Sequence, residues 1–327
     1  MSMIEKCIEA AKARSLSVVL PESGDERMLA AARRLVDEGI ARPILIGKPD
    51  DVATAAKEAG VALDGIEIID SKESDKTDAY TSIYMERRGK TEGVARRMVR
   101  RPLYYAGMMV DQGDADTMVA GVVNATALVI QAGALTVGLA EGIETPSSFF
   151  LMIIPDFQGQ ANKPFIYADC AVNISPTASE LADIAIASEM SARSLLPEDP
   201  RVAMLSFSTK GSASHEDIDL VTEALSIVRS RAANLSVDGE FQADTAIIPG
   251  VAAKKVKEPS EVAGQANVLV FPDLNSGNIA YKLTQYMAGA AAIGPFLQGF
   301  AKPISDLSRG ASVDDIVATT AICLAQV

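Results

Sequence analysis

Cysteine, histidine, tryptophan and aromatic side chains in general are scarce in this sequence. Its 327 residues include three cysteines, one histidine and no tryptophan, and aromatic residues make up 5% of the chain. Cys7, Cys170 and Cys323 are too few and too far apart for a disulfide framework or a CxxC metal site, which is typical of proteins in a reducing cytosol. With one histidine and no cysteine cluster, a metal site would need carboxylates alone, and we expect none.

Positive charge is also in short supply. Against 43 acidic residues there are 30 lysines and arginines, so the formal net charge is −13. This argues against binding to nucleic acid or to an anionic membrane, because both partners are polyanions. The N-terminal segment, residues 1–13, lacks the basic and apolar regions of a signal peptide and is predicted to be an amphipathic helix.

The uncharged residues 117–140 are numerous enough to cross a bilayer. Polar side chains such as Asn124 and Gln131 interrupt the run. An interior strand followed by a buried helix is therefore the simpler interpretation, and we expect no membrane span.

What the sequence does contain is an alternation of short apolar runs with longer segments of helical period. Residues 25–38 and 179–196, for example, have apolar side chains three and four positions apart, and Ser175-Pro176 suits the start of the second helix. Such alternation predicts βαβ units and a largely parallel sheet, and the length suggests two domains. The expected strands are residues 17–20, 43–46, 66–69, 117–121, 149–154, 165–168, 202–207, 245–248 and 267–271.

Several common catalytic and nucleotide-binding motifs are missing. No GxGxxG, HExxH or GxSxG occurs, and the polar loop at residues 208–212 lacks the first glycine of a P-loop. The single histidine, His215, lies in a polar segment, where a role at a helix start or on the surface is expected.

Residues 87–101, RRGKTEGVARRMVRR, concentrate seven basic residues and one acidic residue in an otherwise acidic chain. A small, multiply charged anion would need such a patch. The alternative is a solvated helix face whose arginines, one turn apart, pair with nearby carboxylates. Arg87 and Arg88, at the entrance to this expected helix, are the stronger candidates for ligand contacts.

Residues 306–315, DLSRGASVDD, bring Ser308, Arg309, Asp314 and Asp315 within eight positions. Arg309 could bind two phosphate oxygens, Ser308 could orient an acyl or phosphoryl oxygen, and Asp315 could accept a proton. Ser312 and Asp315 also match a capping box, in which a carboxylate held by backbone N–H groups is a poorer base. From the local pattern alone both interpretations of Asp315 stay open.

With these residues the chain resembles the phosphate acetyltransferase family over almost its whole length. The resembling segments are residues 104–121, 147–152, 167–188, 200–213, 237–247 and 270–317. The resemblance implies two three-layer α/β domains of the isocitrate/isopropylmalate dehydrogenase type with a cleft between them. It places residues 1–143 and 299–327 in the first domain and 144–298 in the second, and it implies a homodimer.

The resemblance also implies an activity: reversible transfer of an acetyl group between acetyl phosphate and coenzyme A, giving acetyl-CoA and inorganic phosphate in the cytoplasm. No metal or bound cofactor is implied, because coenzyme A is a substrate. Asp315 would deprotonate the thiol, Arg309 would bind the phosphate, and Ser308 would hydrogen-bond the acyl phosphate. The implied substrate-binding residues are Arg87, Arg88, Asn124, Thr126, Gln131 and Lys282, with Arg87 or Arg88 anchoring coenzyme A.

The chemistry supports these roles. A thiol with a pKa of about 8.5 is mostly protonated at neutral pH, and the thiolate is the nucleophile, so a base is needed. Arg309 can stabilise the developing oxyanion, and holding both substrates together lowers the entropic barrier. The cysteine of the family's SRGC motif is Ala311 here. A ternary complex, in which coenzyme A attacks acetyl phosphate directly, does not need that cysteine.

Two further departures concern the segment that begins at Asn124. Where the family commonly has Ser-Thr-Ala followed by an arginine, this chain has Ala125 and Gln131. Losing an arginine from an anion site removes a charge-assisted contact, commonly worth about 1.5–3 kcal/mol. Two alternatives stay open: an acyltransferase for another short acyl phosphate such as propionyl phosphate, and a non-catalytic homologue that binds acetyl-CoA and acts in regulation or oligomerisation.

Overall fold

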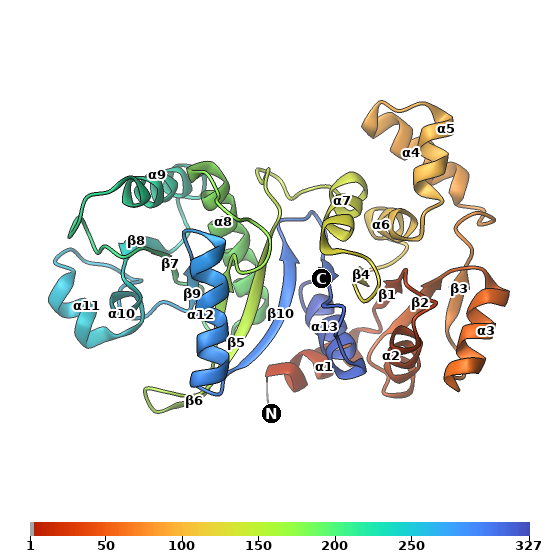
Figure 1. The fold of residues 1–327 in the computed structure, drawn as a ribbon, viewed down its shortest axis with the longest axis horizontal. Helices are drawn as coiled ribbons and strands as arrows, with labels where there is room; N and C mark the ends of the chain where they lie inside the picture. The colour runs from red at the N-terminus through yellow and green to blue at the C-terminus, as the bar shows by residue number, and fades with distance from the viewer. Residues whose placement is uncertain (1–2) are drawn as a thin grey trace. The chain divides into compact units, whose positions relative to one another are not determined.

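The computed structural model describes residues 3–327 and divides the chain into two compact units (Figure 1). One unit comprises the chain up to residue 141 together with residues 300–327, and the other comprises residues 142–299. Each unit combines one sheet with helices on both faces, so the predicted α/β class with two sheets is confirmed. The cleft expected between the domains stays a prediction.

The first unit has a five-stranded parallel sheet in the order β11-β4-β1-β2-β3. The sheet starts at its central strand, β1, continues outward to β2 and β3 on one side, and later gains β4 and β11 on the other side. Loops that follow β1 and β4 therefore diverge, and open α/β sheets bind ligands at such a switch point. The strands are β1 (Ser17–Leu20), β2 (Arg42–Ile46), β3 (Glu67–Ile69), β4 (Thr117–Ala120) and β11 (Ile304–Asp306).

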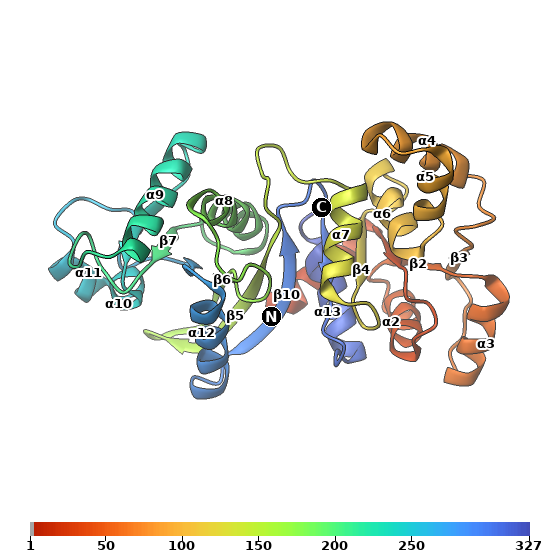
Figure 2. The same ribbon diagram turned by 45° about the horizontal axis from the view of Figure 1, so that its top comes forward.

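Strands β1 and β4 are buried along their whole length, because helices cover both faces of this sheet. One layer contains α1 (Met3–Arg14), α2 (Glu26–Asp37) and α13 (Val313–Leu324), with α3 (Pro49–Ala59) beside α2. The other layer contains α6 (Pro102–Gln112) and α7 (Thr126–Thr136), with α4 (Thr77–Arg88) and α5 (Glu92–Val99) packed outside α6 (Figures 1 and 2).

The second unit has a six-stranded mixed sheet in the order β10-β5-β6-β9-β7-β8, with β5 antiparallel to both of its neighbours. Helices α8 and α9 cover one face, and α10 and α12 pack on the other. The strands are β5 (Ser147–Phe157), β6 (Gln160–Ala168), β7 (Val202–Leu205), β8 (Val237–Phe241), β9 (Val268–Val270) and β10 (Ala291–Gln298). The helices are α8 (Ala178–Leu195), α9 (Glu216–Arg231), α10 (Ala243–Ile247), α11 (Pro249–Lys255) and α12 (Leu274–Met287).

The basic segment at residues 87–101 does not form the single helix that was expected. Helix α4 ends at Arg88 because Gly89 adopts a left-handed backbone conformation with φ 58°. A separate short helix, α5, follows, and Arg101 is the N-cap of α6, in which Pro102 is the first residue. Arg87 and Arg88 therefore lie in the last turn of one helix and not at the start of another.

Other local predictions can be compared with the structure as well. The strand expected at residues 245–248 is wrong, because this apolar run continues the helix α10, and so short a run does not distinguish strand from helix. Helix α8 begins after Thr177, whose capping box with Glu180 places the start two residues beyond Ser175-Pro176. His215 is the N-cap of α9 and accepts a hydrogen bond from the Asp217 backbone, which confirms its expected role at a helix start.

Residues 117–140 form β4 and α7, as predicted. Over residues 3–327 the structure has no helix that is both long and apolar enough to cross a membrane. The predicted N-terminal helix is α1, which begins at Met3; the first two residues of the predicted range lie outside the described part of the chain.

Candidate active site

Three loops of the first unit follow the carboxyl ends of the neighbouring strands β1, β4 and β11: residues 21–25, 121–125 and 307–312. Parallel strands place all their carboxyl ends on one edge of the sheet, so the loops meet there. Segments almost 300 positions apart in the sequence thereby form one surface, and residues 308 and 309 lie on it.

Arg27, in the first turn of α2, connects these loops. Its Nη1 donates hydrogen bonds to the backbone oxygens of Arg309, at 2.7 Å, and Ala311, at 3.0 Å. Its Nη2 donates to the backbone oxygen of Val122, at 3.3 Å, and forms an ion pair with Asp25, at 2.8 Å. The hydrogen bond from Arg27 holds the pKa of the Asp25 carboxyl below its usual value. One guanidinium therefore fixes the β11–α13 loop against both others.

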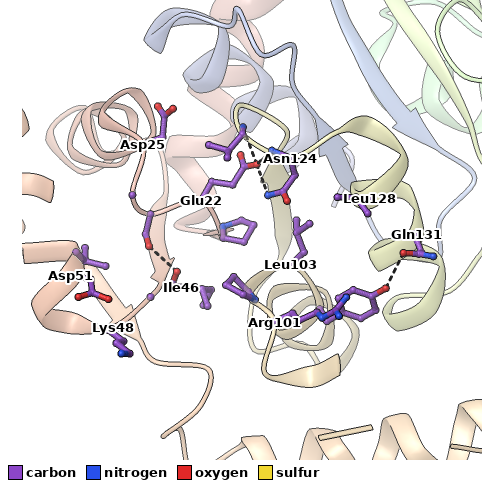
Figure 3. Close-up of a pocket in the computed structure, with 18 residues that line it drawn as sticks. Glu22, Asp25, Ile46, Lys48, Asp51, Arg101, Leu103, Asn124, Leu128 and Gln131 are labelled. Carbon is purple, nitrogen blue, oxygen red and sulfur yellow. Dashed lines mark hydrogen bonds between the residues drawn. The ribbon is translucent and has the colours of Figure 1, made fainter. Parts of the chain in front are cut away.

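Glu22 organises the β4–α7 loop from beneath. Its carboxylate is buried, with 6% of the residue exposed. Oε2 accepts the backbone N–H groups of Gly121 and Val122, at 2.8 and 2.9 Å, and Oε1 accepts those of Val123 and Asn124, at 3.1 and 2.7 Å. Oε1 also accepts a hydrogen bond from Asn124 Nδ2, at 2.8 Å (Figure 3). The position of Asn124 is therefore set by a buried negative charge.

Asp306, the last residue of β11, holds the start of α7. Its Oδ2 accepts a hydrogen bond from the Thr126 hydroxyl, and only 2% of the residue is exposed. Its Oδ1 is buried without a hydrogen-bond partner in the described residues, and a Cβ added at Gly121 would lie 2.3 Å from it. Burial raises the pKa of Asp306 to about 6. Thr126 is thus held to the strand that leads into the Ser308–Arg309 turn.

Ser308 and Arg309 are exposed on the turn after β11. The Ser308 hydroxyl accepts a hydrogen bond from the Gly310 backbone, at 3.2 Å. The Arg309 guanidinium meets no acceptor or carboxylate within residues 3–327, so it is available to bind an anion. Its backbone oxygen, held by Arg27, fixes the turn while the side chain stays open to ligand.

Asp315 lies in the first turn of α13 and forms the capping box that the sequence indicated. Its Oδ2 accepts hydrogen bonds from both the backbone N–H and the hydroxyl of Ser312, each at 2.8 Å. Oδ1 has no partner among the described residues, and Asp315 is exposed. The carboxylate therefore has a fixed orientation and one oxygen free to accept a proton. Asp314, its neighbour, instead pairs with Arg34.

A cavity of about 650 Å³ lies at the switch point of the first unit's sheet (Figure 3). Its apolar walls come from the ends of β1 and β2 and from α6 and α7. Two of the predicted substrate-binding residues, Asn124 and Gln131, line it. The charged residues that line it are Glu22, Asp25, Lys48, Asp51 and Arg101.

The remaining predicted substrate-binding residues do not line this cavity. Arg87 forms an ion pair with Asp111, at 2.7 Å. Arg88 donates to the backbone oxygens of Leu135 and Ala134, at 2.9 and 2.7 Å, and so caps the carboxyl end of α7. Their roles toward coenzyme A stay predictions, because each side chain would have to exchange a protein partner for substrate.

Lys282 belongs to the second unit. It is exposed on α12, with its Nζ 4.8 Å from the centre of the Tyr281 ring. Asn124 and Thr126, by contrast, are close together in the first unit: Asn124 lies in the β4–α7 loop and Thr126 is the first residue of α7. Glu22 holds Asn124, and Asp306 holds Thr126.

Sequence reasoning missed Glu22 and Arg27, and it assigned no individual role to Asp306 or Arg101. Glu22 follows directly after the apolar strand β1, which is a position where functional side chains gather, and that signal was available. Asp306 belongs to the motif that was singled out but was given no role. No local pattern could have indicated the loop contacts of Arg27, because the backbone oxygens that it binds lie about 95 and 280 positions away.

Comparison with known proteins identifies the family of the chain. Residues 2–324 match the family model described as phosphate acetyl/butaryl transferase. The phosphate acetyltransferase of Thermoanaerobacterium thermosaccharolyticum is 46% identical over 330 residues, 98% of this chain and 99% of the relative, and that of Acetivibrio thermocellus is 44% identical over 329 residues, 100% and 98%. A crystal structure of a phosphotransacetylase from Streptococcus pyogenes has a TM-score of 0.90 with 40% identity, covering 99% of this chain and 97% of that one. The chain belongs to the phosphate acetyl/butaryl transferase family.

Proposed function

We propose that this protein catalyses the reversible transfer of an acetyl group between acetyl phosphate and coenzyme A. The observation that carries the proposal is the exposed segment from the turn after β11 to the start of α13, where the Arg309 guanidinium is unpaired, Ser308 is exposed and Asp315 has one free carboxylate oxygen. The relatives that are 44–46% identical over nearly the whole chain are named phosphate acetyltransferases.

The residues of this turn fit the steps of the reaction. Asp315 Oδ1 accepts the proton of the coenzyme A thiol, and Ser312 holds the carboxylate in place. The thiolate attacks the carbonyl carbon of acetyl phosphate and forms the new C–S bond. Arg309 stabilises the negative charge, and Ser308 donates a hydrogen bond to an oxygen of the acyl phosphate. The C–O bond to phosphate then breaks, and inorganic phosphate leaves with the electron pair.

The cysteines support direct transfer in a ternary complex. An acetyl-cysteine intermediate would need an accessible thiol, and all three cysteines are buried. Burial raises the pKa of Cys170 well above its usual value and that of Cys323 to about 12, so neither supplies a thiolate. Ala311, at the position of the family's cysteine, carries no thiol. Direct attack of coenzyme A on acetyl phosphate is therefore the route that we propose.

The test is thioester formation followed by absorbance, with purified protein, coenzyme A and acetyl phosphate in the absence of added metal. Propionyl phosphate is run in parallel to examine the alternative acyl specificity. Rapid turnover with acetyl phosphate supports the proposal. Faster turnover with propionyl phosphate would assign the protein to the other substrate, and no turnover with either, in folded protein, would favour a binding protein without catalysis.

A matched pair of variants tests the base. Asp315→Asn keeps an oxygen for the capping box and removes the proton acceptor, so kcat should fall at least 100-fold, a typical contribution of general base catalysis. Asp314→Asn removes a neighbouring charge whose partner is the exposed Arg34, and kcat should stay within twofold of wild type. Equal kcat values for the two variants would refute the role of Asp315.

We also propose that the protein acts as a homodimer in the cytosol. Helix α12 carries four exposed apolar side chains at positions that share one face: Ile279, Leu283, Tyr286 and Met287. A second copy of the chain would bury this row. Analytical ultracentrifugation of wild type and Leu283→Glu is the test, and a dimer that persists in the variant would exclude this face as the contact.

A further inference from the structure

The arginines of residues 87–101 differ in whether they already bind a carboxylate or another acceptor of the protein. Arg96 forms ion pairs with Asp78, at 2.6 Å, and Glu92, at 3.1 Å. Arg97 and Arg101 are both exposed and have neither an ion pair nor a side-chain hydrogen bond in the described part of the chain. Of the whole segment, only Arg101 lines the cavity at the switch point.

Arg101 lies beside the position where the family arginine is missing. The hydroxyl of Tyr104 donates a hydrogen bond to Gln131 Oε1, at 3.3 Å. Burial raises the pKa of Tyr104, and the positive charge of Arg101 opposes the rise. Figure 3 shows Arg101 and Gln131 on one side of the cavity, with Lys48 and Asp51 on the other.

The acidic residues of the cavity do not neutralise Arg101. Glu22 is saturated by N–H donors of the β4–α7 loop, and Asp25 is paired with Arg27. Asp51 lies on the opposite side with Lys48, which has no ion pair of its own among the described residues. An anion that entered the cavity would therefore meet an unpaired guanidinium, and a lysine across from it.

The size of the cavity and the residues of its walls indicate which anion it would bind. About 650 Å³ is in the range that holds ligands of nucleotide size, whereas acetyl phosphate has only eight heavy atoms. Apolar side chains, among them Ile46, Leu103 and Leu128, form much of the wall and suit a ring system better than a small ion. Of the two substrates, coenzyme A alone combines a nucleotide with several phosphate groups.

We propose that Arg101 binds a phosphate group of coenzyme A in this cavity, and so supplies the positive charge that Gln131 does not. The inference rests on the proposed function for the identity of the ligand. It assigns Arg101 a binding role that lowers the KM for coenzyme A and leaves the chemical step to the turn after β11.

Arg101→Gln tests this proposal, and Arg97→Gln is the matched control: each removes one exposed, unpaired arginine, and only the first faces the cavity. A charge-assisted contact at an exposed site predicts a KM for coenzyme A about tenfold higher in Arg101→Gln, with kcat and the KM for acetyl phosphate unchanged. Arg97→Gln should match wild type. Adding Gln131→Arg to Arg101→Gln should restore a low KM for coenzyme A.

Calorimetric titration of coenzyme A alone separates this proposal from the proposed function, because it needs no turnover. A tenfold weaker Kd in Arg101→Gln, with Arg97→Gln unchanged, supports the role of Arg101 even if wild type proves inactive with acetyl phosphate. An unchanged Kd in folded Arg101→Gln overturns it, even if wild type is an active acetyltransferase. A raised KM for acetyl phosphate in place of coenzyme A overturns it as well.

Discussion

Replacing Glu22 by glutamine changes a single oxygen into an amide nitrogen at the centre of the β4–α7 loop. In the wild type, one carboxylate oxygen accepts the N–H groups of Gly121 and Val122, and the other accepts those of Val123 and the backbone and side chain of Asn124. Glutamine keeps one acceptor oxygen. Its NH2 group must therefore face at least two N–H donors, whichever way the amide is turned.

The magnitude follows from burial. With 6% of Glu22 exposed, water cannot replace the lost acceptor. Each buried donor left unsatisfied costs about 1–3 kcal/mol, so two such donors predict a loss of about 4 kcal/mol in the free energy of unfolding of the first unit. A typical point substitution costs about 1 kcal/mol, so this value is outside the ordinary range.

Amide hydrogen exchange read by mass spectrometry is the most direct assay, because the bonds in question protect the amides of residues 121–124. Urea unfolding followed by circular dichroism gives the global effect, since the chain has no tryptophan for fluorescence. Glu58→Gln, at an exposed position on α3 with no ion pair in the described residues, makes the same chemical change and should shift stability by less than about 0.5 kcal/mol. Unchanged exchange at residues 121–124 in Glu22→Gln would refute the reasoning.

Three further predictions concern the same loops. The raised pKa of Asp306 means that the folded state binds its proton more tightly than the unfolded state, whose pKa is near 4. Its contribution to stability is therefore present below pH 4 and is lost as the pH rises through about 6. From pH 4 to pH 7 the free energy of unfolding of the wild type should fall by up to about 3 kcal/mol relative to that of Asp306→Asn. Parallel pH profiles of the two proteins in urea denaturation would contradict this. Arg27→Gln should lower kcat/KM at least tenfold while the folded fraction by circular dichroism stays unchanged, because the variant frees the Arg309 turn; wild-type kcat/KM would show that the turn needs no such anchor. Ala125 is the N-cap of α7 and its side chain makes no capping hydrogen bond, so Ala125→Ser should raise the free energy of unfolding by about 1 kcal/mol. Urea denaturation measures this change, and a lower or unchanged free energy of unfolding would show that the serine makes no cap.

Much of the fold could be predicted from the sequence, because local patterns carry it. The strands β1, β4 and β7 are short runs buried on both faces, and such runs between helical segments indicate a parallel sheet. The capping box at Ser312 marks the start of α13, whereas Ser175 lies two residues before the N-cap of α8. The apolar run at residues 245–248 failed, because four residues satisfy a helix and a strand equally.

Candidate site residues could be named from the sequence only where they belong to one short motif. Ser308, Arg309 and Asp315 are close in sequence, and the structure places the first two on the turn after β11 and the third in the first turn of α13. Glu22 and Asp306 act through partners about 100 and 180 residues away, and such pairs follow from the strand order, which periodicity does not specify. The basic segment misled for a related reason: whether an arginine is free depends on which carboxylates the fold brings to it.

The two departures at positions 125 and 131 differ in their consequences for the loop they flank. Without a serine at Ala125, the start of α7 loses a side-chain cap, yet the Thr126 bond to Asp306 and the bonds from Glu22 still fix the loop from below. The loss is therefore one of stability, and the position of Asn124 is retained. At Gln131 the loss is one of charge, which no packing contact can replace. An unpaired cation on the same wall can compensate for this loss, and Arg101 is placed to provide one.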